Sequence, residues 1–386
     1  MSKRNVIGIV LALLIIIAGT SAFLIFRSTF TRPEQPKAVR PSPYSVQRSE
    51  EVPFASHRAL SMVASQSATA LLPWGIALDS LYGFTWVAEP GCEPKPKCSS
   101  TIQGILGQYA LSDGTFIANF YEPGGYSSPL FVAVDGNGDV WFTQPSSDAI
   151  GEFDPQNGSW YQWHLRKGSS PFDLIFDTNG NLWFTEFGTS AVGFFNPRTH
   201  TVVENPVPTP DSGPYGITID PQGTIWFAEN AAGVDQIGSF PPTLSGAIKI
   251  TEHDVAPLRP HLIATDRAGN LWYNGGFGGD IGEFNPRSGN RKNFIVYSGT
   301  CSSPATCTGT HISGISVDSK GHVWFTDSLS HRVGYLIPAT GQVVTRILPT
   351  SNGHPYDGLV IDGSDRVWFT QEFGLILAMW PASIVK

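Results

Sequence analysis

A tryptophan returns along this chain at nearly regular intervals, each time inside a near-copy of one phrase. Three copies read TNGNLWFTE at 178–186, PQGTIWFAE at 221–229 and SKGHVWFTD at 319–327. The recurring tryptophans are Trp86, Trp141, Trp183, Trp226, Trp272, Trp324 and Trp368. The steps between them are 55, 42, 43, 46, 52 and 44 residues. Repeats of this length indicate an architecture built by stacking copies of one supersecondary unit.

Each repeat has the same internal order. A short apolar run ending in Asp is followed by a Gly- or Asn-containing turn and then by the Trp-Phe strand. A further strand of the type IGEF follows, and after a Pro/Gly turn comes a fourth apolar run. Four hairpin-connected strands at a period near 44 residues are typical of a propeller blade. The sequence therefore predicts an all-β, seven-bladed β-propeller over residues 53–386, and the 41 Gly and 30 Pro suit its many turns.

Two details of the repeat carry expectations about the architecture. The last repeat is too short for a fourth strand, so residues 53–62 are expected to supply it and thereby close the ring. The Asp before each turn is expected to accept hydrogen bonds from the turn backbone. These residues are Asp79, Asp135, Asp177, Asp220, Asp266, Asp318 and Asp362.

The N-terminal residues 1–26 predict a membrane anchor or a signal segment. Residues 6–26 contain no charge and, as a helix, reach about 30 Å, enough to cross a bilayer. Lys3 and Arg4 precede them and favour a cytoplasmic N-terminus. The alternative is a cleaved signal peptide with its cleavage site at TSA, 20–22. Residues 27–52 form a Pro-rich linker. We therefore expect a propeller outside the cell, on a single-pass membrane anchor or, if the segment is cleaved, secreted.

The cysteines and the net charge support this location and limit the partners. Cys92 and Cys98 form one local pair, and Cys301 and Cys307 form another, each enclosing five residues. Two disulfides in an oxidising compartment are expected. The alternative, a four-thiolate metal site, fits poorly because zinc pairs are usually closer in sequence. The formal charge of −8 argues against a nucleic-acid partner.

The repeats differ at two positions that are expected to lie on one face, near the mouth of the central channel. The entry position lies five residues before the repeated Asp, and the exit position lies three residues after the Trp. The entry residues are Trp74, Leu130, Phe172, Tyr215, His261, Ser313 and Asp357. The exit residues are Glu89, Gln144, Glu186, Glu229, Gly275, Asp327 and Gln371. Both cysteine loops also fall on this face, and insertions on one face commonly mark a binding side.

Acids, aromatic rings and one histidine at these positions are the candidate site residues. His261 is the candidate catalytic residue, because carboxylates beside an imidazole can perform acid–base work or hold a divalent metal. The candidate ligand-binding residues are Trp74, Glu89, Glu186, Tyr215, Glu229, Asp327 and Asp357. The alternative interpretation is that the acids hydrogen-bond neighbouring loops and that His261 is a solvated loop residue. The sequence names no metal ligand set.

The repeats at 177–197 and 213–240 resemble those of the virginiamycin B lyase (streptogramin B lyase) family, and more distantly those of NHL and gluconolactonase-type propellers. The resemblance covers about residues 73–386 and implies the propeller fold. It also implies a Mg²⁺-assisted elimination at the ester of a cyclic depsipeptide, with His261 of RPHLIATD as the matching histidine. This chain departs from the family pattern in three ways. Arg259 replaces an acid, Asn274 and Gly275 of WYNGG replace a glutamate, and Tyr215 and Phe172 stand where a second entry histidine would be.

Two functions from different classes follow. The first is a tethered binding module that takes a small molecule, peptide, glycan or partner protein at the channel mouth. The second is a metal-assisted C–O lyase or lactonase acting on a cyclic ester through His261 and the neighbouring acids, with Mg²⁺ as the possible cofactor. A purely structural cell-surface protein is a third reading.

Overall fold

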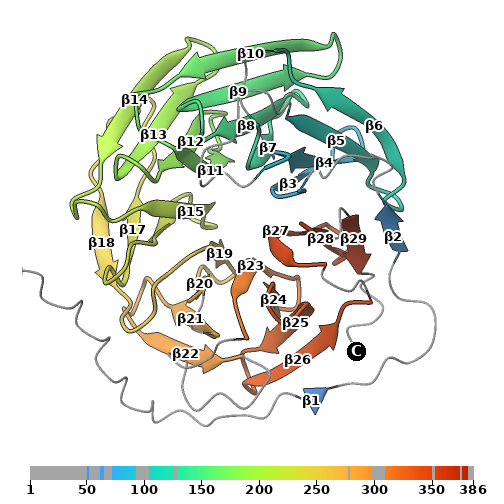
Figure 1. The fold of residues 1–386 in the computed structure, drawn as a ribbon. Coiled ribbons are helices and arrows are strands. Elements are labelled where there is room, and N and C mark those ends of the chain that lie inside the picture. Colours follow the sequence, from blue (N-terminus) through green and yellow to red (C-terminus); the bar gives the residue numbers. More distant parts are fainter. Residues whose placement is uncertain are drawn as a thin grey trace, which may run out of the picture. The chain divides into compact units, whose positions relative to one another are not determined.

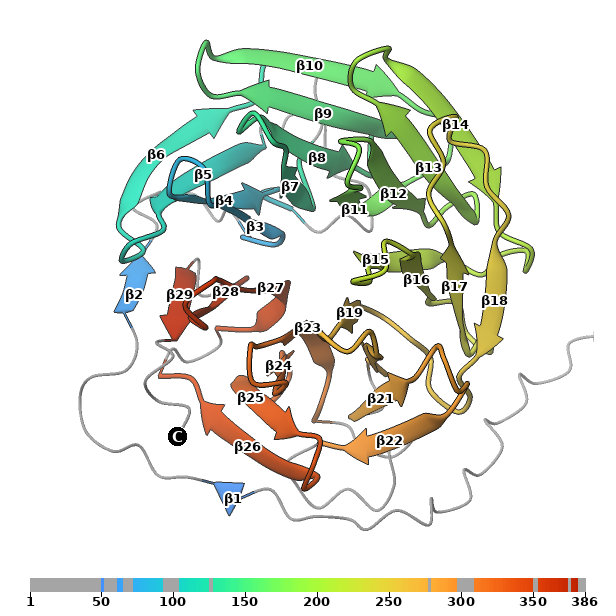
Figure 2. The same ribbon diagram turned by 180° about the vertical axis from the view of Figure 1, so that it is seen from behind.

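The computed structural model describes nine stretches of the chain. These stretches are residues 50–51, 61–64, 72–92, 104–124, 128–276, 279–296, 309–349, 353–373 and 376–380. Within them every regular element is a strand, and the strands form seven sheets arranged in a ring (Figures 1 and 2). The predicted all-β, seven-bladed propeller is therefore confirmed.

In blades 1 to 5 the four strands run outward from the centre in chain order and pair antiparallel (Figure 1). Blade 1 holds β3 (Ile76–Asp79), β4 (Phe84–Glu89), β5 (Ile105–Ala110) and β6 (Phe116–Tyr121). Blade 2 holds β7 (Val132–Val134), β8 (Val140–Gln144), β9 (Ala149–Asp154) and β10 (Ser159–His164). Blade 3 holds β11 (Pro171–Phe176), β12 (Leu182–Glu186), β13 (Ala191–Asn196) and β14 (Thr201–Pro206). Blade 4 holds β15 (Pro214–Ile219), β16 (Ile225–Glu229), β17 (Gln236–Phe240) and β18 (Thr251–Asp254).

The remaining blades include strands from both ends of the described chain. Blade 5 holds β19 (Ile263–Thr265), β20 (Leu271–Asn274), β21 (Asp280–Phe284) and β22 (Arg291–Ile295). Blade 6 holds β23 (Ile312–Val317), β24 (Val323–Asp327), β25 (Arg332–Ile337) and β26 (Gln342–Ile347), with β1 (Glu50–Glu51) parallel to β26. Blade 7 holds β27 (Pro355–Ile361), β28 (Val367–Gln371), β29 (Ile376–Trp380) and β2 (Ser61–Ala64).

The ring closes in blade 7 as the short last repeat predicts. Strand β2 pairs antiparallel with β29 from Ser61↔Met379 to Ala64↔Ile376, and so supplies the missing outer strand. The pairing residues lie at the end of the expected range 53–62 and just beyond it. The innermost strands contact one another around the whole ring, including β27 of blade 7 against β3 of blade 1. The pairing of β1 with β26 was not expected, because residues 27–52 read as a linker.

Neighbouring blades are also joined by hydrogen bonds from the Trp-Phe-Thr phrase. Thr143 Oγ1 of blade 2 donates to the Phe172 carbonyl of blade 3 at 2.6 Å. Thr370 Oγ1 of blade 7 donates to the Trp74 carbonyl of blade 1 at 2.7 Å. Thr185 and Thr326 donate in the same way to Tyr215 and Tyr356 of the next blade. The backbone carbonyl at the entry position therefore joins neighbouring blades. The entry side chain takes no part in this hydrogen bond, so its type can differ between blades.

The repeated Asp accepts turn hydrogen bonds, as expected, and it also binds the tryptophan of its own repeat. In blade 4, Asp220 Oδ1 accepts from the backbone N–H groups of Gln222 and Thr224, and Oδ2 accepts from Trp226 Nε1 at 2.9 Å. Asp135, Asp177, Asp266, Asp318 and Asp362 bind their tryptophans in the same way. This contact needs a separation of six residues between the Asp and the Trp.

Blade 1 departs from this arrangement because its turn is one residue longer. Asp79 accepts from the backbone N–H groups of Leu81 and Tyr82. Trp86 Nε1 is buried and has no hydrogen-bond partner among the described residues. The Asp–Trp bond is therefore a consequence of turn length.

The exit acids lie inside their own blades. Glu89 accepts from Tyr109 Oη at 3.2 Å, and Glu186 accepts from Thr189 Oγ1 at 2.6 Å. Burial is the main cause that raises the pKa of Glu89, Glu186 and Glu229 to about 7. These three carboxyl groups therefore lie in the blade interior, where ionisation is costly.

Replacing Asp220 with alanine is expected to destabilise the propeller by about 2–3 kcal/mol, because two backbone donors and the buried Trp226 indole lose their acceptor. Urea unfolding measures the change. Gln222→Ala in the same exposed turn is the control and should leave the free energy of unfolding nearly unchanged. Equal effects of the two substitutions would contradict the assigned role of Asp220.

The free energy of unfolding is expected to fall as pH rises from 5 to 8. A carboxyl whose pKa is higher in the folded state than in the unfolded state stabilises the fold below its unfolded pKa, and this stability is lost as pH rises through the folded value. Glu229, whose pKa rises from an ordinary value of 4.5 to about 7 in the folded protein, should contribute about 2 kcal/mol of this loss.

Glu229→Gln should flatten the dependence by that amount in urea unfolding at pH 5, 6, 7 and 8. Asp211→Asn, a substitution at an exposed carboxylate, is the control and should keep the wild-type slope. An unchanged slope for Glu229→Gln would show that this carboxyl titrates normally in the folded protein.

Candidate axial binding site

Register shifts in the innermost strands mark the entry positions. In β11 the shift lies between Pro171 and Leu174, and in β15 it lies between Pro214 and Ile217. In β23 and β27 the shifts likewise enclose Ser313 and Asp357. An extra residue in one strand re-aims the side chains around it. These irregularities set the directions of the entry side chains near the centre of the ring.

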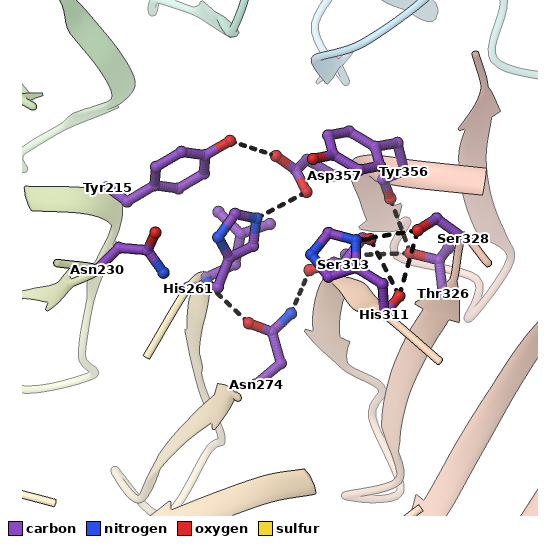
Figure 3. A network of polar contacts seen from close by, with 12 residues as sticks. Tyr215, Asn230, His261, Asn274, His311, Ser313, Thr326, Ser328, Tyr356 and Asp357 are labelled. Carbon is purple, nitrogen blue, oxygen red and sulfur yellow. Dashed lines mark hydrogen bonds and ion pairs between the residues drawn. The ribbon is translucent and has the colours of Figure 1, made fainter. Parts of the chain in front are cut away.

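Three of the predicted site residues meet there, and we call them the axial cluster: Tyr215, His261 and Asp357. Tyr215 Oη donates to Asp357 Oδ2 at 2.7 Å, and His261 Nε2 lies 3.1 Å from Asp357 Oδ1 (Figure 3). They come from blades 4, 5 and 7, and all three are buried. A contact between blades 4 and 7 crosses the centre of the ring (Figure 1).

The charge states in the axial cluster follow from burial and from these contacts. Burial opposes ionisation of Asp357, but the His261 charge and the hydrogen bonds from His261 and Tyr215 outweigh it, and the pKa of Asp357 is lowered. Burial and the Asp357 charge raise the pKa of Tyr215 well above its ordinary value, so its hydroxyl stays protonated. Asp357 is therefore a carboxylate that accepts from both neighbours.

In this arrangement one ring nitrogen of His261, Nδ1, does not contact Asp357. A carboxylate only accepts hydrogen bonds, so Nε2 of His261 carries the hydrogen that faces Asp357. Among the described residues, Nδ1 of His261 makes no hydrogen bond. Nδ1 can accept a hydrogen bond or a proton when the ring is neutral, and it can donate one when the ring is protonated.

Aromatic rings surround the axial cluster. Tyr215 stacks on His261 with ring centroids 4.2 Å apart and lies 4.6 Å from Phe172. Trp74, another predicted site residue, meets Tyr356 edge to face at 4.6 Å. Apolar walls with a few placed polar groups are typical of small-molecule sites.

Sequence reasoning underrated two residues that the structure places here. His311 lies 5.6 Å from His261 between ring centroids, and its Nδ1 contacts the hydroxyls of Ser313 and Ser328 (Figure 3). Burial, with the His261 charge, lowers the pKa of His311 to about 3, so this ring is neutral. Asp173, directly after an entry position, is half-buried, and its Oδ2 accepts from the Ile217 N–H at 3.0 Å. Burial raises its pKa to about 7. Neither residue type recurs at the matching position of the other repeats, so the repeat gave no signal for them.

The predicted exit acids do not join the axial cluster. Glu89 and Glu186 make the contacts within their own blades that are described above. Asp327 differs from Glu89 and Glu186. Its Oδ1 accepts a hydrogen bond from the His311 backbone N–H at 3.0 Å and so supports the loop that carries His311. The structure therefore brings together the entry residues Tyr215, His261 and Asp357, with Trp74 nearby.

The residues around His261 do not fit a divalent metal. Asn274 Oδ1 accepts from the Leu262 N–H at 2.8 Å, and Asn274 Nδ2 donates to the Ser313 carbonyl, so this amide joins blades 5 and 6. Arg259 places a positive charge beside the same entry. Across the part of the chain that the structure describes, no group of three or more His, Cys, Asp or Glu residues is arranged to hold a metal ion. The Mg²⁺ that the resemblance suggests thus lacks a donor set.

Two other expectations fall mainly outside the described residues. Of the four cysteines only Cys92 is described, so the two disulfides stay predictions. Residues 1–26 are not described, and among the residues that are, no helix has the length and apolarity needed to span a bilayer.

Solved structures with the same fold include two lyases. Virginiamycin B lyase from Staphylococcus aureus matches with a TM-score of 0.69 and 22% identity, over 83% of this chain and 98% of that one. A streptogramin B lyase matches with a TM-score of 0.69 and 21% identity, over 83% and 96%. A catalytically inactive histidine-to-alanine variant of the S. aureus enzyme, solved with quinupristin, matches with a TM-score of 0.55 and 26% identity, over 66% and 84%.

A search of curated proteins finds no match to this chain. The sequence model of the virginiamycin B lyase family, in contrast, matches residues 105–305, which include four of the seven recurring tryptophans and the entry residues Tyr215 and His261. This match spans more than half of the chain. The chain therefore belongs to the virginiamycin B lyase family.

Proposed function

We propose that this protein binds a ligand at the axial cluster, outside the cell membrane. The observation that carries the proposal is the chain of hydrogen bonds from Tyr215 through Asp357 to His261. The blade repeat does not require these polar groups, because Leu130 and Phe172 occupy the same position in blades 2 and 3. A buried carboxylate costs free energy, and perturbed titratable groups gather at functional sites.

The surroundings indicate the kind of ligand. Phe172, Tyr215, Tyr356 and Trp74 offer ring faces and edges near the axial cluster. Such surfaces suit a small molecule or a peptide that carries aromatic or apolar groups. The related S. aureus variant was solved with quinupristin. Quinupristin is therefore a suitable first probe.

A second candidate function is a C–O lyase or lactonase acting on a cyclic ester. The specific observation in its favour is the Asp357–His261 pair, which holds the imidazole in one tautomer and leaves Nδ1 as a base. In an elimination, Nδ1 would take a proton from the carbon next to the one that bears the ester oxygen. The C–H electron pair would form a C=C bond between these two carbons, and the C–O bond would break to release a carboxylate. The steps assigned to this chain are the orientation of His261 by Asp357 and the proton transfer to Nδ1.

We further propose that residues 6–26 anchor the protein in the cell membrane with the propeller outside. The support is the uncharged stretch itself, preceded by Lys3 and Arg4. Secretion after cleavage near 20–22 is the alternative.

Binding at the axial cluster can be tested with quinupristin. We expect the wild-type protein to bind it in isothermal titration calorimetry. His261→Ala should weaken binding by about tenfold or more, because a ring face and a polar contact are lost. His164→Ala, an exposed histidine at the end of β10, is the control and should bind like wild type.

The same samples separate the two candidate functions. Mass spectrometry of the bound probe shows ring opening if the protein is a lyase, and His261→Ala should then abolish it. Recovery of bound quinupristin with its ring intact would support the binding function rather than the lyase function. Equal affinity of His261→Ala and wild type would contradict the axial site.

Deletion of residues 6–26 should move the protein out of the membrane fraction, because the only predicted anchor is lost. Cell fractionation with an antibody against the propeller measures this. Full-length protein that stays in membranes after a carbonate wash supports the anchor. Full-length chain recovered in the medium with an N-terminus near residue 23 would show a cleaved signal instead.

A further inference from the structure

We propose that the axial site recognises its ligand through a carboxylate, and that Arg259 is the residue that binds this carboxylate. The inference rests on the proposed function and adds the charge of the ligand to it. Arg259 lies two residues before His261, at the entry to blade 5.

The guanidinium of Arg259 is held in one orientation. Its Nε donates to the Asn230 carbonyl, and its Nη2 donates to Asn230 Oδ1 at 3.1 Å. Asn230 is buried, and its Nδ2 donates to the Pro260 carbonyl at 2.8 Å. The amide that orients Arg259 is therefore itself fixed by the residue between Arg259 and His261. An arginine whose fork is oriented in advance loses less side-chain entropy when it binds an anion.

The charge of Arg259 has no ion-pair partner among the described residues. Arg291 and Arg366, in contrast, pair with Asp254 and Asp362. The Asp235 charge raises the pKa of Arg259, although burial has the larger, opposite effect, and no ion pair forms between the two side chains. Arg259 is exposed, and Nη1 makes no hydrogen bond among the described residues. Solvent or a ligand can therefore reach this nitrogen.

Arg259 also lies close enough to the axial cluster to act with it. Asn230, which binds the guanidinium of Arg259, also binds the carbonyl of Pro260, the residue directly before His261 (Figure 3 shows Asn230 and His261). The Arg259 charge is also one of the smaller causes that lower the pKa of His311, whose ring centroid lies 5.6 Å from that of His261. A ligand that stacks on the rings around His261 can thus extend a charged group to Arg259.

The contacts of the charged groups favour an anion. The carboxylate of Asp357 already accepts hydrogen bonds from His261 and from the Tyr215 hydroxyl. Burial raises the pKa of Asp173 to about 7, so its negative charge is weakened at neutral pH. Arg259, in contrast, donates only to Asn230 and forms no ion pair with a carboxylate among the described residues. The planar fork of arginine matches a carboxylate through paired N–H donors, and such charge-assisted hydrogen bonds are strong.

Two matched probes test the inference: N-acetyl-phenylalanine and N-acetyl-phenylalaninamide, which share the aromatic ring but differ in charge. Calorimetric titration of the full chain should show that the acid binds about tenfold more tightly than the amide. Arg259→Gln should abolish this preference, because it removes the charge that distinguishes the acid from the amide. Arg287→Gln, in an exposed turn of the same blade, is the control and should keep the preference.

Other outcomes would overturn the inference. Equal affinity of the wild-type protein for the two probes would do so while leaving the proposed binding function intact. A preference for the acid that survives in Arg259→Gln would show that another group binds the carboxylate. Binding of neither probe would count against both the inference and the proposed function. If Arg259→Gln does not fold, Arg259→Lys keeps the charge but not the fork, and it should lose most of the preference.

Discussion

Closure of the ring is the constraint on which the rest of the structure depends. Blade 7 takes its outer strand β2 from the opposite end of the described chain, and Thr370 bonds the carbonyl of Trp74 in blade 1. Strand pairing removes the open edge that an incomplete last blade would present. Closure also sets the distance across the centre, so the contact between Tyr215 of blade 4 and Asp357 of blade 7 exists only in the closed ring.

The blade repeat separates structural from functional demands within a few residues. The threonine after the Trp-Phe pair binds an entry carbonyl of the next blade, and the turn Asp binds the indole of its own Trp. Neither contact involves an entry side chain, although several of these side chains pack in the hydrophobic core. Freedom from these two contacts allows leucine or phenylalanine in two blades and the polar axial cluster in three others. Selection can thus alter the site without altering the contacts that hold the ring together.

The period of the tryptophans was sufficient to predict the fold, the number of blades and the strand exchange at closure, because each follows from packing one unit repeatedly. The entry register also placed Tyr215, His261 and Asp357 on one face. Their mutual contacts could not be predicted, because they depend on register shifts in the innermost strands that leave no periodic trace. Exit acids such as Glu89 and Glu186 shared the expected face, yet their side chains turn into the blade interior. His311 and Asp173 belong to single blades, so no comparison among repeats could give them weight.

The exchange of β2 also has a consequence for the order of events during synthesis. Strand β2 is made long before its partner β29, so it must wait unpaired while almost the whole propeller is synthesised. Asp357 lies in the last blade to emerge, and its partners Tyr215 and His261 emerge earlier. A nascent or truncated chain therefore has neither a closed ring nor an assembled axial cluster. Only a complete, closed molecule would then bind the ligand. In an incomplete chain, the unpaired strand β2 would be an exposed segment that chaperones can bind.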